Sequence, residues 1–559
     1  MRFQPDLPPG RLEKSIAAGY WGDTLFAERF ESAAIAALDR VAVVSENSET
    51  LAVTTLSYRH LLRLARRAAA GLVQLGIGRG DVVAMQLPNW WHYAVMYPAC
   101  AYIGAVFNPL MPIFRERELE FMLGFAQTKL LVIPNSFRGF SYPAMLERLR
   151  PALPSLEHVL VADAPWQGPS SKTDHEMQSF ESTLLEPRWE DDEKLMQRVV
   201  DQRPGAGDVT ELMYTSGTTG QPKGVMHTAN TLLCKARFAK ELFGLTDDDV
   251  VYMGSPLAHQ TGFMYAVVFP LIYGLKCVLQ DVWDPVVAAR KIQDEKCTIT
   301  LGSTPFLSDL VNNPNVRDYD LSSLRLFLCA GAPIPRVLLR EAARVLPDLY
   351  VMSAWGMTEN GIVTATYPGD PEEKVFESDG RALPGQEVRV VDDDGQAVPS
   401  GQEGRLQSRG PTTFVGYFNL PKPHGDDQDS EWFDTGDNAR MDRDGYIRIT
   451  GRSKDIIIRG GENVPVVEVE ELIYRHESVV DAAVVAIPDE RLGERGCAFV
   501  QLKQGTSLTL DELVSFLLAR KLTKTYLPER LELVSEFPRT PSGKIQKFKL
   551  REQATKMSA

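Results

Sequence analysis

The spacing of apolar residues along the chain alternates between a helical and a strand period. Residues 56–75 carry apolar side chains at helical spacing, and residues 81–86 follow as a short apolar run. The alternation continues through residues 90–105, 116–125 and 129–133. Helices that alternate with short buried strands are typical of an α/β domain with a largely parallel sheet. We therefore predict a layered α/β fold for this part of the chain.

The same pattern returns after a polar segment. Residues 163–194 are polar and interrupted by prolines, which indicates a surface excursion with little chemistry. Asp284 and Pro285 fit the N-cap and the first position of a later helix. Further strands are predicted at residues 209–214, 250–253, 276–279, 298–301, 324–329 and 349–352.

From residue 380 the pattern changes to short alternating segments separated by turn clusters such as Asp393-Asp394-Gly395. We expect a small antiparallel β subdomain with strands at residues 388–391, 405–408 and 446–449. After Arg452 the pattern fits a separate α+β unit, with helices at residues 468–476 and 510–521 and strands at residues 482–487 and 498–502.

These patterns divide the chain into two expected domains. Residues 1–453 would form a large N-terminal domain of layered α/β subdomains plus the small β subdomain, and residues 454–559 a small C-terminal α+β domain. A chain of 559 residues is too long for one hydrophobic core, which agrees with this division.

Composition narrows the class of protein. Hydrophobic residues make up 44% and charged residues 24% of the chain, as in ordinary globular enzymes. The formal net charge of -14 argues against nucleic acid as a partner. Six scattered cysteines without a CxxC pair indicate neither a zinc site nor disulfides and fit the reducing cytoplasm. We expect no signal peptide and no membrane span, while peripheral membrane contact and the oligomeric state stay open.

One segment, residues 214–225, gathers three glycines, three threonines, a serine and a lysine between a predicted strand and a helix at residues 228–243, capped by Thr228 or Asn230. Glycines let backbone N–H groups approach an oxyanion, and the hydroxyls and the lysine add donors and charge. Pro222 stands before Lys223 where a P-loop needs glycine, so this is not that motif. A flexible linker is the alternative, but a lysine fixed behind proline favours a phosphate-binding loop.

This segment closely resembles the phosphate-binding signature of the adenylate-forming enzymes, a family that includes acyl-CoA synthetases, luciferases and peptide-synthetase adenylation domains. Six separate motifs follow the family's order over about residues 50 to 550. The resemblance implies that ATP is a substrate and that its phosphates contact Thr215, Ser216, Gly217, Thr218, Thr219, Gly220 and Lys223.

Three further motifs imply contacts to the rest of the nucleotide. In the resemblance, Thr358 contacts the α-phosphate, Glu359 holds Mg²⁺, and Asp437 with Arg452 binds the ribose. The family usually has tyrosine where this chain has Trp355, which alters the wall of the site in detail. Taken singly, these residues fit helix caps and turns. The implied nucleotide-binding set also contains Gly331, Ala332, Pro333, Gly356 and Met357.

The C-terminal part carries two lysines with distinct implied roles. Lys454 resembles the family's hinge residue, which makes the C-terminal domain mobile, and Lys544 resembles the catalytic lysine. Lys547 stands where many relatives have arginine, so charge is kept while geometry differs. A solvated linker pair and a solvated tail lysine are the alternatives. The implied face for coenzyme A is formed by Gly460, Gly461 and Glu462.

The resemblance also implies a pocket for a carboxylic acid. His259 follows a predicted strand and would orient the acid, although a lone histidine is more often structural. The residues around the pocket include no obvious buried cation for a second carboxylate, so a monocarboxylic aliphatic, alicyclic or aromatic acid is expected. Bacterial short- or medium-chain fatty acid and alicyclic acid ligases look most similar. The implied wall residues are His259, Gly262, Phe263, Gly302 and Ser303.

Together the motifs imply an AMP-forming acid:CoA ligase that uses ATP, Mg²⁺ and coenzyme A. A carboxylate is a poor electrophile, so ATP first converts it to an acyl-adenylate, and a thiol then attacks the activated carbonyl. Attack of one anion on another needs charge cancellation in a water-poor cleft. Three alternatives stay open: an adenylation enzyme that loads a separate carrier protein, a luciferase-like oxidase, and a noncatalytic nucleotide-binding module.

Overall fold

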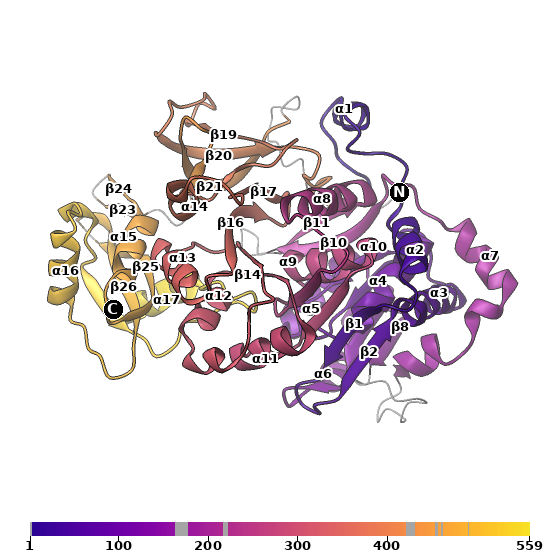
Figure 1. The fold of residues 1–559 in the computed structure, drawn as a ribbon. Coiled ribbons are helices and arrows are strands. Elements are labelled where there is room, and N and C mark those ends of the chain that lie inside the picture. The colour runs from indigo at the N-terminus through magenta and orange to yellow at the C-terminus, as the bar shows by residue number, and fades with distance from the viewer. Residues whose placement is uncertain are drawn as a thin grey trace.

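The computed structural model describes residues 3–162, 177–215, 222–420, 431–452, 457–459, 462–489 and 491–558. In this part of the chain, mixed α/β layers form a large N-terminal body and a smaller C-terminal unit (Figure 1). None of its helices combines the length and the apolar character needed to cross a bilayer. The predicted fold class is therefore confirmed.

One layer of the N-terminal body is a seven-stranded sheet in the order β11-β10-β4-β3-β5-β8-β9. All of its neighbouring strands are parallel except the hairpin of β10 and β11. The strands are β3 (Val82–Met85), β4 (Val106–Pro109), β5 (Leu130–Pro134), β8 (His158–Ala162), β9 (Gln178–Ser179), β10 (Val209–Thr215) and β11 (Lys223–Thr228). The accompanying helices are α3 (Tyr58–Gln74), α4 (His92–Ile103), α5 (Glu116–Ala126), α6 (Tyr142–Leu149) and α7 (Glu193–Asp201).

The second layer is a nine-stranded sheet in the order β18-β17-β16-β15-β14-β12-β13-β1-β2, with antiparallel strands at both edges. Its strands are β1 (Val41–Glu46), β2 (Val53–Ser57), β12 (Val250–Met253), β13 (Lys276–Gln280), β14 (Ile299–Gly302), β15 (Leu326–Cys329), β16 (Tyr350–Met357), β17 (Gly361–Ala365) and β18 (Arg381–Ala382). Its helices are α8 (Ala229–Leu242), α9 (Gln260–Phe263), α10 (Phe269–Tyr273), α11 (Pro285–Glu295), α12 (Thr304–Asn312), α13 (Arg336–Val345) and α14 (Glu372–Glu377).

Two smaller units complete the described chain. The antiparallel β subdomain consists of β19 (Glu387–Val391), β20 (Glu403–Arg409), β21 (Phe433–Met441) and β22 (Ile447–Arg452). The C-terminal unit packs α15 (Val466–Tyr474), α16 (Leu510–Ala519) and α17 (Lys547–Ser558) on a sheet of β23 (Ile457–Arg459), β24 (Glu462–Val464), β25 (Val479–Asp489), β26 (Gly493–Leu502) and β27 (Arg530–Leu533). Its hydrophobic clusters contain only residues from 457 onward, so this unit has cores of its own.

The C-terminal unit lies against the end of the body that carries α12 and α13 (Figure 1). Arg448 of β22 forms an ion pair with Glu471 of α15. The Ser303 hydroxyl donates a hydrogen bond to the Ser542 carbonyl oxygen at 2.5 Å. These contacts join the two parts beside the ends of the central strands of the nine-stranded sheet.

Most predicted elements are present, with ends shifted by a few residues. Thr228 caps α8 and Asp284 caps α11, each by accepting hydrogen bonds from backbone N–H groups. Part of the polar segment at residues 163–194 is not a surface excursion. The Phe180 and Leu184 side chains are fully buried, and Glu181 pairs with the buried His92. The prediction of a surface excursion is therefore wrong for residues 177–185, while residues 163–176 lie outside the described chain.

Candidate active site

A cleft of about 2950 Å³ opens where the body, the β subdomain and the C-terminal unit meet. Residues at the ends of strands β10, β15 and β16 and at the starts of helices α9 and α12 line the cleft. Residues 539–548 of the C-terminal unit also line it. Ligands of open α/β sheets bind beside the carboxyl ends of parallel strands, which is where this cleft lies.

Lys544 enters the cleft from a tight turn of the C-terminal unit. The turn is closed by Thr540, which accepts a hydrogen bond from the Lys544 N–H through its hydroxyl at 3.0 Å and donates its own N–H to the Lys544 carbonyl at 2.8 Å. Gly543 adopts a φ of +84°, and a Cβ there would lie 2.8 Å from Ser303 Oγ. Glycine at this position therefore permits the close approach of the turn to the body.

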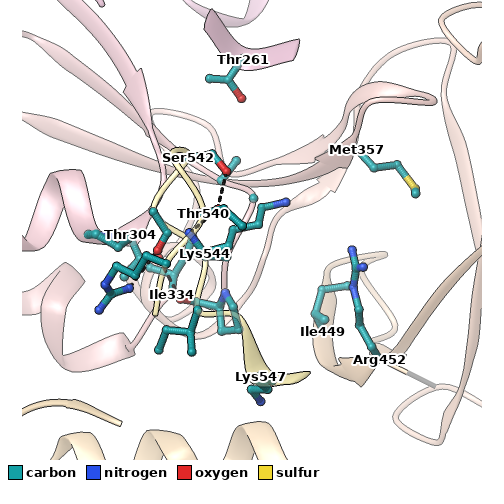
Figure 2. A pocket seen from close by; sticks show the side chains of 18 of the residues that line it. Thr261, Thr304, Ile334, Met357, Ile449, Arg452, Thr540, Ser542, Lys544 and Lys547 are labelled. Atoms are coloured by element: carbon teal, nitrogen blue, oxygen red, sulfur yellow. Dashed lines mark hydrogen bonds between the residues drawn. The ribbon is translucent and has the colours of Figure 1, made fainter. Parts of the chain in front are cut away.

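The surroundings of Lys544 combine both signs of charge. Figure 2 shows Lys544 in the middle of the cleft, with Ile334 on one side and Arg452 on the other. Loss of surrounding water and the nearby Arg452 guanidinium lower the pKa of Lys544 to about 8, while Asp437 and Glu359 act in the opposite direction. The amine is thus aimed at a space bounded by two carboxylates and a second cation.

Asp437 is held by two side chains at the edge of this space. Trp355 donates its indole N–H to Asp437 Oδ2 at 2.9 Å, and Arg452 Nε lies 3.0 Å from Asp437 Oδ1. The carboxylate is 5% exposed. A buried carboxylate fixed by two donors offers its remaining lone pairs in defined directions, which suits recognition of hydroxyl groups.

Thr358 and Glu359 occupy the connection between β16 and β17. Asn360 Oδ1 accepts a hydrogen bond from the Met357 N–H at 2.9 Å, and Gly361 has a φ of +70°, so the connection is tight. The Glu359 carboxylate accepts a hydrogen bond from the Tyr417 hydroxyl at 2.9 Å. Burial is the largest influence on Glu359 and raises the pKa of its carboxyl group.

Glu359 fits a divalent cation held between phosphates. A buried carboxylate is the hard oxygen ligand that Mg²⁺ prefers, and Mg²⁺ commonly takes one or two protein carboxylates together with phosphate oxygens. The described residues contain no cluster of three or more His, Cys, Asp or Glu side chains that could hold a metal ion.

Lys223 begins β11 directly opposite Thr215, the last residue of β10. Its Nζ lies 4.8 Å from the centroid of the Tyr417 ring, and Tyr417 in turn contacts Glu359. The two ends of the predicted phosphate loop are therefore near the Glu359 carboxylate. The loop residues Ser216, Gly217, Thr218, Thr219 and Gly220 lie outside the described residues.

The turn of Gly331, Ala332 and Pro333 connects β15 to α13 and lines the same cleft. The Thr304 hydroxyl donates a hydrogen bond to the Pro333 carbonyl at 2.8 Å. A Cβ added at Gly331 would lie 3.5 Å from Lys544 Cε. The turn is therefore adjacent to the lysine and offers backbone and small side chains to the cleft.

His259 caps α9 through Nδ1, which accepts a hydrogen bond from the Thr261 N–H at 3.3 Å. Loss of water and the charge of Lys544 lower the pKa of His259 to about 3, so its imidazole is neutral at neutral pH. His259 therefore lies near the catalytic candidate Lys544 and offers the cleft an uncharged ring.

Not every predicted wall residue reaches the cleft. Phe263 packs into the core against Tyr97 and Phe107, with ring centroids 4.8 and 5.6 Å away. A Cβ on Gly262 would lie 2.1 Å from the Pro256 carbonyl oxygen, so this glycine is needed for packing. Gly302 is likewise absent from the lining, while Ser303 binds the Lys544 turn. The helical face that lines the cleft instead carries Gln260, Thr261, Met264 and Tyr265.

A buried cation that sequence reasoning missed lies on this wall. Lys235 of α8 is 3% exposed and lines the cleft. Its Nζ lies 2.9 Å from His227 Nε2 and donates to the Thr358 carbonyl oxygen at 3.4 Å. The prediction that the pocket offers no obvious buried cation for a second carboxylate overlooked Lys235, although Glu211 opposes its charge. The sequence offered one signal for this buried lysine, because Lys235 falls on the apolar face of a predicted helix. The sequence does not indicate its partners, since Thr358 and Glu211 lie in other segments.

The predicted face for coenzyme A lies partly outside the described residues. Lys454, Gly460 and Gly461 lie outside the described residues. Glu462 begins β24, which pairs with β23. Its backbone is thus placed in the sheet of the C-terminal unit.

Comparison with known proteins gives a consistent result. Residues 30–418 match a family model described as AMP-binding enzyme, and residues 468–544 match one described as AMP-binding enzyme C-terminal domain. The chain is 38% identical to a medium-chain fatty-acid–CoA ligase of Escherichia coli (strain K12), over 95% of this chain and 91% of that protein. It is 34% identical to a putative acyl-CoA synthetase, YngI, of Bacillus subtilis (strain 168), over 90% and 92%. Among solved structures, ATP-bound MatB from Rhodopseudomonas palustris superposes with a TM-score of 0.78 at 26% identity, covering 95% of this chain and all of that one (100%).

Proposed function

The chain belongs to the family of AMP-binding enzymes, and we propose that it is an AMP-forming acid:CoA ligase. The acid is activated by ATP to an acyl-adenylate with release of pyrophosphate, and the acyl group then passes to coenzyme A with release of AMP. One observation carries this proposal: Lys544, Glu359 and Asp437 converge on one cleft in a chain that matches an acyl-CoA ligase over nearly its full length.

In the first step a carboxylate oxygen attacks the α-phosphorus, and the bond to pyrophosphate breaks. We propose that Lys544 spans the carboxylate and the α-phosphate, and that Thr358 contacts the same phosphate. Both groups offset charge that would otherwise oppose the attack of one anion on another. Mg²⁺ bound at Glu359 would add positive charge at the phosphates.

The nucleotide contacts follow from the same geometry. Asp437 would accept hydrogen bonds from the ribose hydroxyls, because Trp355 and Arg452 already hold its carboxylate in place. The turn of Gly331, Ala332 and Pro333 would contact adenine together with Gly356 and Met357, which line the same cleft. Lys223 and the loop from Thr215 would bind the leaving phosphates.

We also propose that the C-terminal unit moves between the two steps. The boundary would fall between residues 453 and 454, with Lys454 as pivot and Gly460, Gly461 and Glu462 on the face for coenzyme A. Two facts support this. The unit has cores of its own, and its contacts to the body include the ion pair of Arg448 with Glu471, which can form and break.

The cytoplasm is the proposed location, because all six cysteines are free thiols buried in the fold. The acid is proposed to carry a single carboxylate, because the charge of the buried Lys235 is opposed by Glu211.

Product analysis tests the proposal directly. Incubation with ATP, Mg²⁺, coenzyme A and a panel of acids should give acyl-CoA and AMP in equal amounts. Adenylate and pyrophosphate alone, with coenzyme A left unused, would indicate an enzyme that loads a carrier protein. Retention of ATP without turnover for every acid would contradict catalysis.

A further inference from the structure

A buried polar side chain, Gln260, lies on the wall of the cleft that also carries Met264 and Tyr265. Gln260, the first residue of α9, lines the cleft beside His259 and is 6% exposed. Neither its amide oxygen nor its amide nitrogen has a hydrogen-bond partner among the described residues. Burying an amide without partners costs roughly 1 to 3 kcal/mol, so a group that binds Gln260 in the cleft is strongly favoured.

A second polar group lies behind Gln260. Glu211 of β10 is fully buried, and both of its carboxylate oxygens lack hydrogen-bond partners in the described part of the chain. The Gln260 amide is close enough to lower the pKa of Glu211, although its geometry is not that of a hydrogen bond. Glu211 does not line the cleft itself, so Gln260 is the member of this pair that a ligand in the cleft can contact.

Lys235 sets the charge of this wall. Burial lowers the pKa of Lys235, and the nearby Glu211 raises it. For Glu211 the directions are reversed, because burial raises its pKa and the nearby Lys235 lowers it. The pair is thus neutral overall, whether both groups are charged or both uncharged. An anionic substituent on the acid would meet no net positive charge, and a cationic one would meet no net negative charge.

A neutral hydroxyl group matches what the Gln260 amide lacks. A hydroxyl donates one hydrogen bond and accepts others. It can donate to Gln260 Oε1 or accept from Gln260 Nε2. A methyl group of similar size can do neither, so it would leave the amide buried without a partner.

Building on the proposed ligase activity, we propose that Gln260, with the buried Glu211 behind it, forms a polar subsite that binds a hydroxyl substituent on the acyl part of the acid. The substrate class is therefore hydroxy-substituted carboxylic acids. Met264 and Tyr265 supply the rest of this wall, so the carbon skeleton around the hydroxyl is still held by apolar and aromatic contacts.

Matched pairs of acids test the subsite. Each pair carries a hydroxyl or a methyl group at the same carbon of cyclohexanecarboxylate, benzoate or hexanoate, and kcat/KM is measured from AMP formation with coenzyme A present. For at least one pair the hydroxy acid should be preferred by about tenfold or more, since a site built to bind a hydroxyl rejects an analogue that lacks it. The Gln260→Leu variant should reduce this preference by about tenfold, with the KM for ATP unchanged.

Two further variants complete the test. Glu211 acts through Gln260, so Glu211→Gln, which keeps the shape of the side chain, should also lower the preference. Met264→Leu changes the same wall without touching a hydrogen-bonding group and should change both acids of a pair alike. Preference for the methyl acid in every pair, or a preference unchanged in both Gln260→Leu and Glu211→Gln, would overturn the subsite while the ligase activity stands. Absence of AMP formation with every acid would instead refute the proposed function.

Discussion

Replacing Lys544 by methionine removes one charge from the cleft and keeps most of the side-chain volume. Lys544 reaches this position from the C-terminal unit, and its turn is fixed by Thr540 and by the contact of Ser303 with Ser542. One preorganised charged contact that stabilises the transition state raises the rate by about 10²- to 10³-fold, which corresponds to about 2.7 to 4 kcal/mol. We expect pyrophosphate release by Lys544→Met to fall by that factor.

The second half-reaction gives the contrast. If Lys544 acts only while the adenylate forms, Lys544→Met should convert supplied acyl-adenylate and coenzyme A to acyl-CoA within about threefold of the wild-type rate. Lys549→Met, which removes an exposed lysine of α17, is the matched control and should leave both half-reactions unchanged. Equal losses in both half-reactions of Lys544→Met, with an unchanged melting temperature, would refute the assignment.

The pH dependence of adenylation provides a second measure of the same residue. The pKa of Lys544 is lowered to about 8, so the required charge is present below pH 8 and is lost above it. Adenylation should therefore fall by nearly tenfold per unit at pH values well above 8. Lys544→Arg keeps its charge throughout this range, so its residual activity should not show the decline. A wild-type profile that stays flat to pH 10 would contradict this role.

Three other substitutions test separate parts of the cleft. Trp355→Phe removes the N–H donor to Asp437 and should raise the KM for ATP about fivefold with little change for the acid, because one hydrogen bond to a charged group is lost; a selective change for the acid would contradict this. Glu359→Gln removes the anionic ligand and should raise the Mg²⁺ concentration needed for half-maximal activity at least tenfold, so a wild-type Mg²⁺ titration would refute the role. His259→Ala should change the order of preference among acids more than the KM for ATP, and the reverse result would remove His259 from the acid site.

Local patterns allowed much of the fold and the motif positions to be predicted from sequence. Strand β10, the capped helix α8 and the N-cap at Asp284 each follow from apolar spacing or capping chemistry within a few residues. Strand β11 is not predicted from the sequence, because residues 214–225 are interpreted as one phosphate-binding loop and Thr228 as the start of the following helix. Pairing with β10 satisfies the backbone hydrogen-bonding groups of β11. That pairing depends on the geometry of the hairpin rather than on the composition of the segment.

The acid-binding wall shows what sequence alone cannot supply. Phe263 was expected in the pocket, but the π-helix Met264–Val268 follows it directly, and the face toward the cleft carries Met264 instead. Lys235 and Glu211 lie 24 positions apart, on α8 and β10, and become neighbours only when the helix packs on the sheet. No pattern within either segment indicates that pairing, so the charge of the wall appears only in three dimensions.

An oxygen-labelling experiment tests the central claim, activation of the acid as an acyl-adenylate, most directly. A substrate acid labelled with ¹⁸O in its carboxylate is incubated with ATP, Mg²⁺ and coenzyme A, and the products are analysed by mass spectrometry. Because a carboxylate oxygen bonds to the α-phosphorus and the thiol later breaks the bond between that oxygen and the carbonyl carbon, one ¹⁸O atom should appear in AMP for each acyl-CoA formed. Label in phosphate or pyrophosphate, or unlabelled AMP, would contradict the acyl-adenylate and with it the proposed reaction.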